Sequence, residues 1–193
     1  MKKVFMFLGV LVLMAAAAQA YQVNVDYWVV DANLGVGYPV LGTDDNLNVG
    51  FDGGISARKG LDQEISVGGG LSYVTMPYKI SGAPAPFSAT VFDAEAVYAP
   101  YLPDFIVWPY AKFGIGIYML NYDSISGEGS AATSASSSET SFGFLLGGGL
   151  RYPITNDFAA NVEALYNQCS VNGGTGDVYS FITFRIGLTM FLK

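Results

Sequence analysis

The chain closes on residues 180–193, SFITFRIGLTMFLK, in which apolar residues recur at every second position. Phe184, Ile186 and Leu188 belong to one series, whereas Arg185 belongs to the other. A period of two is typical of a β-strand, because successive side chains point to opposite faces of the sheet. One face of this strand is therefore predicted to be apolar, and the other must accommodate a charge.

The same alternation occurs in eight segments, separated by stretches rich in turn residues. Strands are predicted near residues 22–31, 47–58, 64–78, 89–99, 107–122, 141–152, 158–168 and 178–192. Long connections, such as 31–46 and 123–140, alternate with short ones, such as 59–63 and 153–157. An even number of strands with alternating long and short connections is typical of outer-membrane barrels, whose short turns are periplasmic.

The two series of strand positions differ in composition. One is aliphatic and aromatic, and its only charge is Asp31 at a predicted strand end. Its tyrosines near strand ends, together with a tryptophan by a short turn, predict aromatic girdles at the membrane interfaces. These residues are Tyr27, Tyr73, Tyr98, Tyr152, Tyr166 and Trp108. The other series combines many glycines with nearly all the strand charges.

Two kinds of barrel fit this division. A soluble lipocalin-like barrel would turn the apolar series inward, whereas a membrane barrel would turn it toward lipid. The glycines favour the membrane barrel, because an eight-stranded barrel has an interior just wide enough for side chains to fill. On a solvated outer face, glycine would only weaken the strands. The predicted fold is all-β, an eight-stranded antiparallel up-and-down transmembrane β-barrel.

This assignment directs a group of charged side chains into the lumen, where buried charges are expected to be paired. The predicted network consists of Asp26, Asp52, Arg58, Glu64, Asp93, Glu95, Lys112, Arg151, Glu163 and Arg185. Hairpin symmetry places three acids opposite three bases. The predicted pairs are Arg58–Glu64 about Leu61, Glu95–Lys112 about the Pro103–Asp104 bond, and Glu163–Arg185 about Gly174. The network is interpreted as an ionic plug, and the alternative is a polar path for small solutes.

The chain from YQVNVDYW (21–28) to FRIGLTMFLK (184–193) resembles the OmpA/OmpX-like family of small outer-membrane barrels. The stretches PYAKFGIGIY (109–118) and FGFLLGGGLRYPITNDFAANVEALYN (142–167) carry much of the likeness. The resemblance implies a closed barrel with both termini in the periplasm, folded by the barrel-assembly machinery. Family members often end on an aromatic residue that this machinery reads, whereas this chain ends Phe191-Leu192-Lys193.

Composition bounds the remaining expectations. Residues 1–20 have the basic start, apolar middle and Ala-Gln-Ala end of a signal peptide, which leaves 21–193 as one exported domain. A net charge of −7 argues against nucleic acid as a partner. The absence of histidine removes the usual catalytic triads and the commonest transition-metal ligand. Neither glycine triplet, 68–70 or 147–149, leads into a helix with a following lysine, so no phosphate loop is predicted.

The leading hypothesis is a non-enzymatic, monomeric barrel in outer-membrane lipid, without cofactor or metal. It would anchor surface loops for envelope integrity or surface binding, with residues 123–140 as a mobile loop open to a ligand. The first alternative is a narrow channel for small solutes or ions. Two others are a lipid-modifying or protease barrel that uses Asp and Ser, and a soluble exported lipid-binding barrel.

Overall fold

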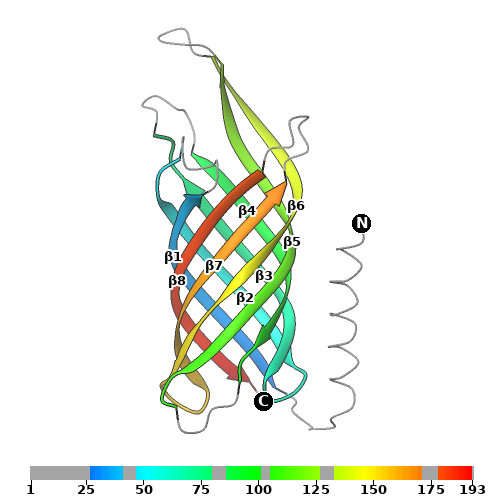
Figure 1. Cartoon of the computed structure of the whole chain (residues 1–193), viewed down its shortest axis with the longest axis vertical. Coiled ribbons are helices and arrows are strands. Elements are labelled where there is room, and N and C mark those ends of the chain that lie inside the picture. Colours follow the sequence, from blue (N-terminus) through cyan, green and yellow to red (C-terminus); the bar gives the residue numbers. More distant parts are fainter. Residues whose placement is uncertain are drawn as a thin grey trace.

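The computed structural model is a closed antiparallel barrel in which each strand pairs with its neighbours in sequence and β1 pairs with β8 (Figure 1). It describes residues 27–40, 47–79, 86–100, 105–126, 133–170 and 178–192, and only the backbone of 123–126 and 133–136. The predicted leader 1–20 lies outside these residues. The strands are β1 (Trp28–Val40), β2 (Gly50–Gly60), β3 (Ile65–Met76), β4 (Phe87–Tyr98), β5 (Trp108–Ser126), β6 (Thr133–Pro153), β7 (Phe158–Ser170) and β8 (Val178–Leu192).

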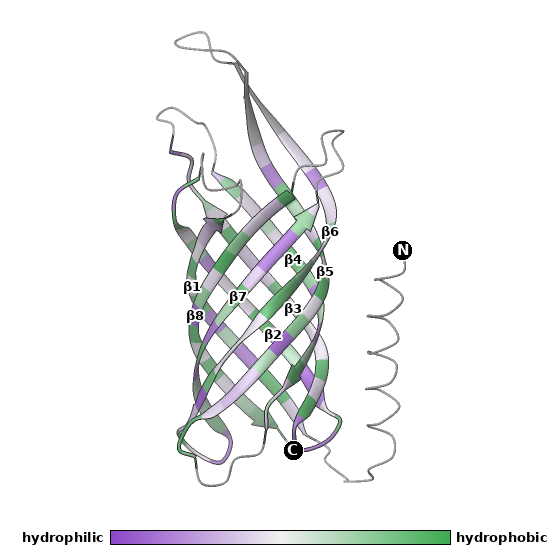
Figure 2. Ribbon diagram, in the orientation of Figure 1, coloured by the Kyte–Doolittle hydropathy of each residue, from purple (hydrophilic) through white to green (hydrophobic). Residues whose placement is uncertain are grey.

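Hydropathy alternates along the strands in Figure 2, and many large apolar side chains of the strands are exposed on the outside of the barrel. Ile55, Ile115 and Ile186 are 60%, 56% and 68% exposed, whereas Asp52 and Lys112 in the same barrel are buried. A monomer in water does not leave such a continuous apolar belt uncovered. The predicted outward apolar face is therefore confirmed for β2 to β8, and the strand charges of the predicted network lie on the inward face.

The first strand differs from its prediction in both position and facing. It runs from Trp28 to Val40 rather than over 22–31, so much of the predicted loop 31–46 is strand. Val29 and Asp31 are buried, whereas Trp28 and Leu34 are 48% and 61% exposed. The physical reason is that apolar residues occupy both parities in this segment, and the sequence pattern could not choose between them. The buried Asp31 carboxylate, which pairs inside the lumen, selects the observed facing.

The aromatic girdle is also partly corrected. Tyr73, Tyr98 and Tyr152 are about half exposed on the outer face, as predicted. Trp108 instead belongs to the inward series, and its ring lies 6.5 Å from that of Phe191 in an edge-on contact. The tryptophan that is exposed on the outer face is Trp28, the first residue of β1.

The two ends of the barrel have different connections. At one end, Asp62 Oδ1 accepts hydrogen bonds from the backbone N–H of Glu64 and Ile65 at 2.8 and 2.6 Å. Thr155 Oγ1 does the same for the turn between β6 and β7. Such side-chain acceptors stabilise short turns. Trp28 pairs with Leu192. The first residue of β1 and the last residue of β8 therefore both lie at this short-turn end.

At the opposite end, the longest predicted loop is largely a hairpin. Residues 123–140 were expected to form a mobile loop, yet β5 and β6 remain paired as far as Ser126 and Thr133. Their hairpin extends above the other strands (Figure 1). The prediction failed because the backbone ladder needs no apolar side chains, and Ser/Thr/Ala composition carries no signal for it.

Candidate functional site in the barrel lumen

Every second residue of each strand points toward the barrel axis, so charges from seven strands converge there. β3 supplies none of them, because its inward positions carry only small or apolar side chains. Near the loop end, Glu139 of β6 also has the inward parity and accepts a hydrogen bond from the Tyr122 hydroxyl at 3.2 Å. The other inward acids of the described residues are Asp31, Asp52, Asp93, Glu95 and Glu163, and the inward bases are Arg58, Lys112, Arg151 and Arg185. All of these except Asp93, which is partly buried, are almost completely shielded from solvent.

Arg58 is the most deeply buried of the bases, with an exposed fraction of 0%. Its guanidinium donates hydrogen bonds to Asp31 on β1 and to Glu95 on β4. It also donates to Ser56 Oγ at 2.8 Å. The planar, delocalised guanidinium suits a buried site between two carboxylates, because it can donate in several fixed directions.

Lys112 on β5 links two acids from different parts of the barrel wall. Its Nζ lies 3.5 Å from Glu95 Oε2 and 3.0 Å from Glu163 Oε2. Tyr110 also donates a hydrogen bond from its hydroxyl to Glu163 Oε2, at 3.0 Å. Glu95 therefore connects Arg58 to Lys112, and Lys112 continues the chain of charges to Glu163 on β7.

Arg185 closes the network between β8, β7 and β2. Its Nε and Nη2 both donate to Asp52, the latter at 3.0 Å, and its Nη1 donates to Glu163 Oε1 at 3.3 Å. The two-point contact with Asp52 has the geometry of a strong charge-assisted pair. Glu163 and Arg185 are direct cross-strand partners, so the contact expected between them is present.

Arg151 is the least satisfied cation of the group. Its Nη2 lies 3.6 Å from Asp31 Oδ2, and its guanidinium carbon lies 4.4 Å from the centre of the Tyr110 ring. Its Nε and Nη2, together with Asp31 Oδ1 and Asn161 Oδ1, are buried without a hydrogen-bond partner in the described part of the chain. Buried polar groups of this kind are usually bridged by ordered water.

The structure corrects the remaining predicted members. Glu64 lies in the turn after β2, and Arg58 faces Gly68 rather than Glu64, because the turn is centred farther along the chain. Glu95 faces Gly114, so Glu95 and Lys112 meet although they are not directly opposed. Asp93 lies inside but makes no ion pair with another described residue, and Asp26 lies outside the described residues.

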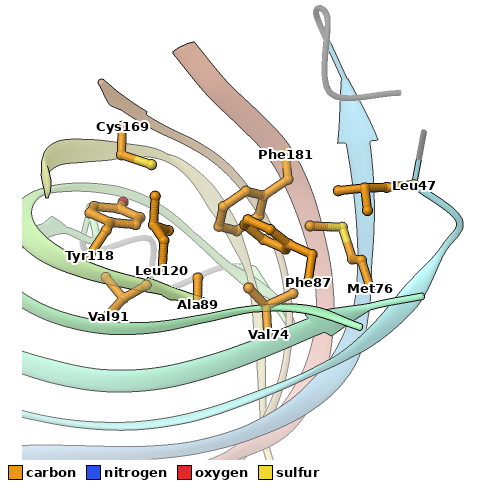
Figure 3. Packing of buried hydrophobic residues seen from close by; sticks show 10 residues of the cluster. All are labelled: Leu47, Val74, Met76, Phe87, Ala89, Val91, Tyr118, Leu120, Cys169 and Phe181. Carbon is orange, nitrogen blue, oxygen red and sulfur yellow. The ribbon is translucent and has the colours of Figure 1, made fainter. Parts of the chain in front are cut away.

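Sequence reasoning assigned Asp31 to the outer face and so missed it as a lumen residue. The signal that could have placed it was the cost of an unpaired carboxylate in lipid. The reasoning also missed that the loop end of the lumen is apolar. There, Val74 and Met76, Phe87, Tyr118 and Phe181 form a buried cluster with neighbouring residues (Figure 3).

The inward apolar cluster and the ionic network fill successive parts of the lumen. Phe87 on β4 and Phe181 on β8 belong to this one cluster although three strands separate β4 from β8 in either direction around the barrel (Figure 3). Below them, the cavity beside Asp93, Lys112 and Arg185 has a volume of only about 10 Å³. This volume corresponds to roughly one water molecule. We refer to the two parts as the apolar layer and the ionic layer.

The arrangement has no nucleophile paired with a base, and the chain contains no histidine. Within the described ranges, no three side chains of the metal-ligating types gather at one point. Inside those ranges there is also no helix that is long and apolar enough to cross a membrane. The described lumen side chains hold opposite charges in fixed positions within a narrow space.

Comparisons with known proteins agree with this architecture. The family model described as outer membrane protein beta-barrel domain matches residues 6–190. A comparison with curated protein sequences finds no match to this chain.

Several solved structures share the fold at low sequence identity. Neisserial surface protein A is 20% identical with a TM-score of 0.55, and the match covers 86% of this chain and 96% of that one. OprG from Pseudomonas aeruginosa is 12% identical with a TM-score of 0.56, covering 87% and 96%. A major outer membrane protein from Thermus thermophilus is 11% identical with a TM-score of 0.52, covering 86% and 99%.

Proposed function

Because the chain belongs to the outer membrane protein beta-barrel domain family, we propose that it is a sealed, non-enzymatic barrel that presents the β5–β6 hairpin at the cell surface. The single observation that carries this proposal is the continuous filling of the lumen by the apolar and ionic layers. An eight-stranded barrel has little interior space beyond its own side chains. A filled lumen leaves the outer ends of the strands as the part able to meet other molecules.

The proposed orientation places both termini and the short turns in the periplasm. Two features support this orientation. The short turns stabilised by side chains lie at the end where β1 begins and β8 ends, and the projecting β5–β6 hairpin lies at the other end. Short periplasmic turns and longer outer connections are the rule in such barrels. The hairpin, residues 123–140, is the proposed contact for a surface ligand.

We further infer a monomer that folds with the barrel-assembly machinery. Within the barrel wall, the closed ladder leaves no described strand edge available for pairing with a second chain, whereas the projecting part of the β5–β6 hairpin keeps its outer edges unpaired with any described strand. The non-enzymatic assignment is supported by the absence of histidine and by the engagement of the lumen acids with arginines and a lysine. Acids held this way are poor candidates for general acid–base work.

A narrow channel is the second candidate, and one observation favours it. Several buried polar atoms in the lumen, including Arg151 Nη2 and Asn161 Oδ1, have no hydrogen-bond partner among the described residues and would bind water. Planar-bilayer recordings on the purified protein distinguish the two candidates. The unmodified barrel is expected to give no discrete conductance steps, and steps would establish the channel instead.

A variant with shortened side chains in both the apolar layer and the ionic layer serves as the positive control for these recordings. Lys112→Ala and Glu163→Ala remove an ion pair from the ionic layer, and Phe87→Ala and Phe181→Ala open the apolar layer. Either pair of substitutions alone should leave the lumen closed, whereas the combination should conduct. Heat-dependent gel mobility and the circular dichroism of the strands verify that each variant is folded.

A further inference from the structure

The outer face of strands β3 to β6 changes from apolar to polar toward the loop end of the barrel. One row of cross-strand partners on this face is apolar, and we call it the apolar row. It consists of Leu71, Phe92, Ile117 and Phe142, which are 40%, 49%, 40% and 77% exposed. Nearer the loop end, a second outward row carries hydroxyl and amide groups, and we call it the polar collar. It consists of Thr75, Ser88, Asn121 and Ser138.

The inner face changes in the opposite sense over the same part of the strands. Next to the apolar row, the inward positions are occupied by Asp93 and by glycines. Next to the polar collar, the inward row contains Val74, Ala89 and Leu120, which are buried members of the apolar layer (Figure 3). The row ends at Glu139, which the Tyr122 hydroxyl binds. At this level the barrel is therefore polar outside and largely apolar inside, the reverse of its arrangement nearer the short turns.

The solvent around each part of the barrel explains this reversal. In the hydrocarbon of a bilayer, an outward polar group has no water to bind, so outward positions there are apolar. An apolar interior also gains little in that region, because lipid tails are as apolar as the side chains themselves. In water the balance is the opposite, since burial of apolar side chains is the dominant favourable term in folding. The polar collar and the apolar layer therefore both indicate polar surroundings.

At the short-turn end, by contrast, the outward series remains apolar beyond the ends of the strands. Leu61 follows β2 and Ile154 follows β6, both continue the outward parity, and they are 40% and 57% exposed. From Phe142 to Ile154, about 3.3 Å per residue and a tilt of about 40° give a rise of roughly 30 Å, the thickness of a hydrocarbon core. On β1 and β2, Tyr38 and Val49 remain exposed toward the loop end, so the collar is confined to β3 to β6.

We propose that the lipid acyl chains end between the apolar row and the polar collar, and that the collar contacts the polar headgroups of the leaflet on the loop side. The apolar layer is then the hydrophobic core of a section of the barrel that stands at and above the membrane surface. The level of this boundary follows from the two rows alone. Only the assignment of the collar to the outer leaflet rests on the orientation given under Proposed function.

Tryptophans placed along β5 test the level of the boundary. The chain's two tryptophans are first replaced, as Trp28→Phe and Trp108→Phe. Ile115→Trp, Ile117→Trp and Asn121→Trp are then introduced singly at exposed outward positions. In vesicles of phosphatidylcholine brominated on its acyl chains, the fluorescence of the first two variants should be quenched and that of Asn121→Trp largely retained. Acrylamide in the aqueous phase should give the opposite order.

The neighbouring strand provides a matched comparison. Leu146 and Ser138 are exposed outward residues of β6, below the boundary and in the collar respectively. Leu146→Trp should respond as Ile115→Trp does, and Ser138→Trp as Asn121→Trp does, so the test stands if one variant does not fold. Heat-dependent gel mobility verifies folding. As a second measurement, Ile117→Lys should lower the unfolding midpoint in urea, whereas Asn121→Lys should leave it unchanged, because only the first charge lies in lipid.

Two results would overturn the proposal. If brominated chains quench Asn121→Trp and Ser138→Trp as strongly as Ile117→Trp, then acyl chains cover the collar. If both collar positions are protected from brominated chains and from acrylamide, another protein or a second copy of this chain covers it instead. Because both leaflets of the vesicles contain the brominated lipid, an inverted orientation would not alter these readings, and surface tagging on intact cells tests that orientation separately.

Discussion

Arg58 and Lys59 are adjacent cations that the pleat of β2 sends to opposite environments. Arg58 is completely buried between Asp31 and Glu95, whereas Lys59 is on the outer face. Arg58→Met should lower the free energy of unfolding by about 3–5 kcal/mol, because two carboxylates lose their buried partner. Lys59→Met should change it by no more than about 0.5 kcal/mol.

Urea unfolding of the barrel in lipid vesicles measures both values under the same conditions. The neighbouring substitution is the matched control, since the two variants replace a cation by the same residue one position apart. Losses of similar size would show that the buried pairs contribute no more than a surface charge does.

Arg185 has two acidic partners, and the geometry ranks them. Its Nε and Nη2 bind Asp52, whereas Glu163 receives only Nη1 and is also bound by Lys112 and Tyr110. In double-mutant cycles with Arg185→Met, Asp52→Asn should therefore show a larger coupling energy than Glu163→Gln. The unfolding midpoints of the single and double variants give both couplings. A larger coupling to Glu163 would contradict the observed two-point contact with Asp52.

The cross-strand register decides how much of this network the sequence could predict. Glu163 and Arg185 are symmetric about Gly174, and the observed hairpin has that register. The predicted Arg58–Glu64 pair is wrong because the centre of the hairpin lies farther along the chain than Leu61. Asp62 Oδ1 accepts hydrogen bonds from the backbone N–H of Glu64 and Ile65, which places these residues in the turn. Arg58 also pairs with Asp31 on β1 and with Glu95 on β4. Such contacts depend on the closure of the whole barrel, so the symmetry of a single hairpin could not predict them.

At the scale of the strands, six of the predicted eight have bounds within four residues of the observed ones, because the outward parity of each is apolar. β6 begins eight residues earlier than predicted, at Thr133. β1 was misplaced because Val29 and Val30 are equally apolar, and Gly35 and Gly37 resemble turn residues. Gly35 has a structural reason, since a Cβ there would lie 2.0 Å from the Phe184 carbonyl oxygen of the paired strand. Close backbone approach, rather than a turn, accounts for this glycine.

The facing of β1 can be tested by cysteine labelling in a background where Cys169 is replaced by serine. Ala32 is exposed and Asn33 is buried. Ala32→Cys should therefore react with a lipid-soluble maleimide in membranes, whereas Asn33→Cys should be protected. The reverse pattern would restore the facing predicted from the sequence alone. Ser72→Cys, on the inward face of β3, provides a second protected position for comparison.

For the whole molecule, the orientation in the membrane is the property on which the proposed function depends. An epitope tag inserted at Ala132, between β5 and β6, should be reached by antibody on intact cells. A tag in the short turn at residues 154–157 should be reached only after the outer membrane is permeabilised. Access to the second tag alone on intact cells would mean that the barrel is inverted.

The β5–β6 hairpin has a further consequence for how the surface of this protein can evolve. Pairing of β5 with β4 ends at Asn121, whereas pairing with β6 continues to Ser126. At about 3.3 Å per residue, the projecting part adds roughly 15 Å of height. Its shape depends on N–H and C=O groups that every non-proline residue possesses. In the proposed orientation, mutations can therefore change the side chains displayed at the cell surface while the backbone of the hairpin keeps its form.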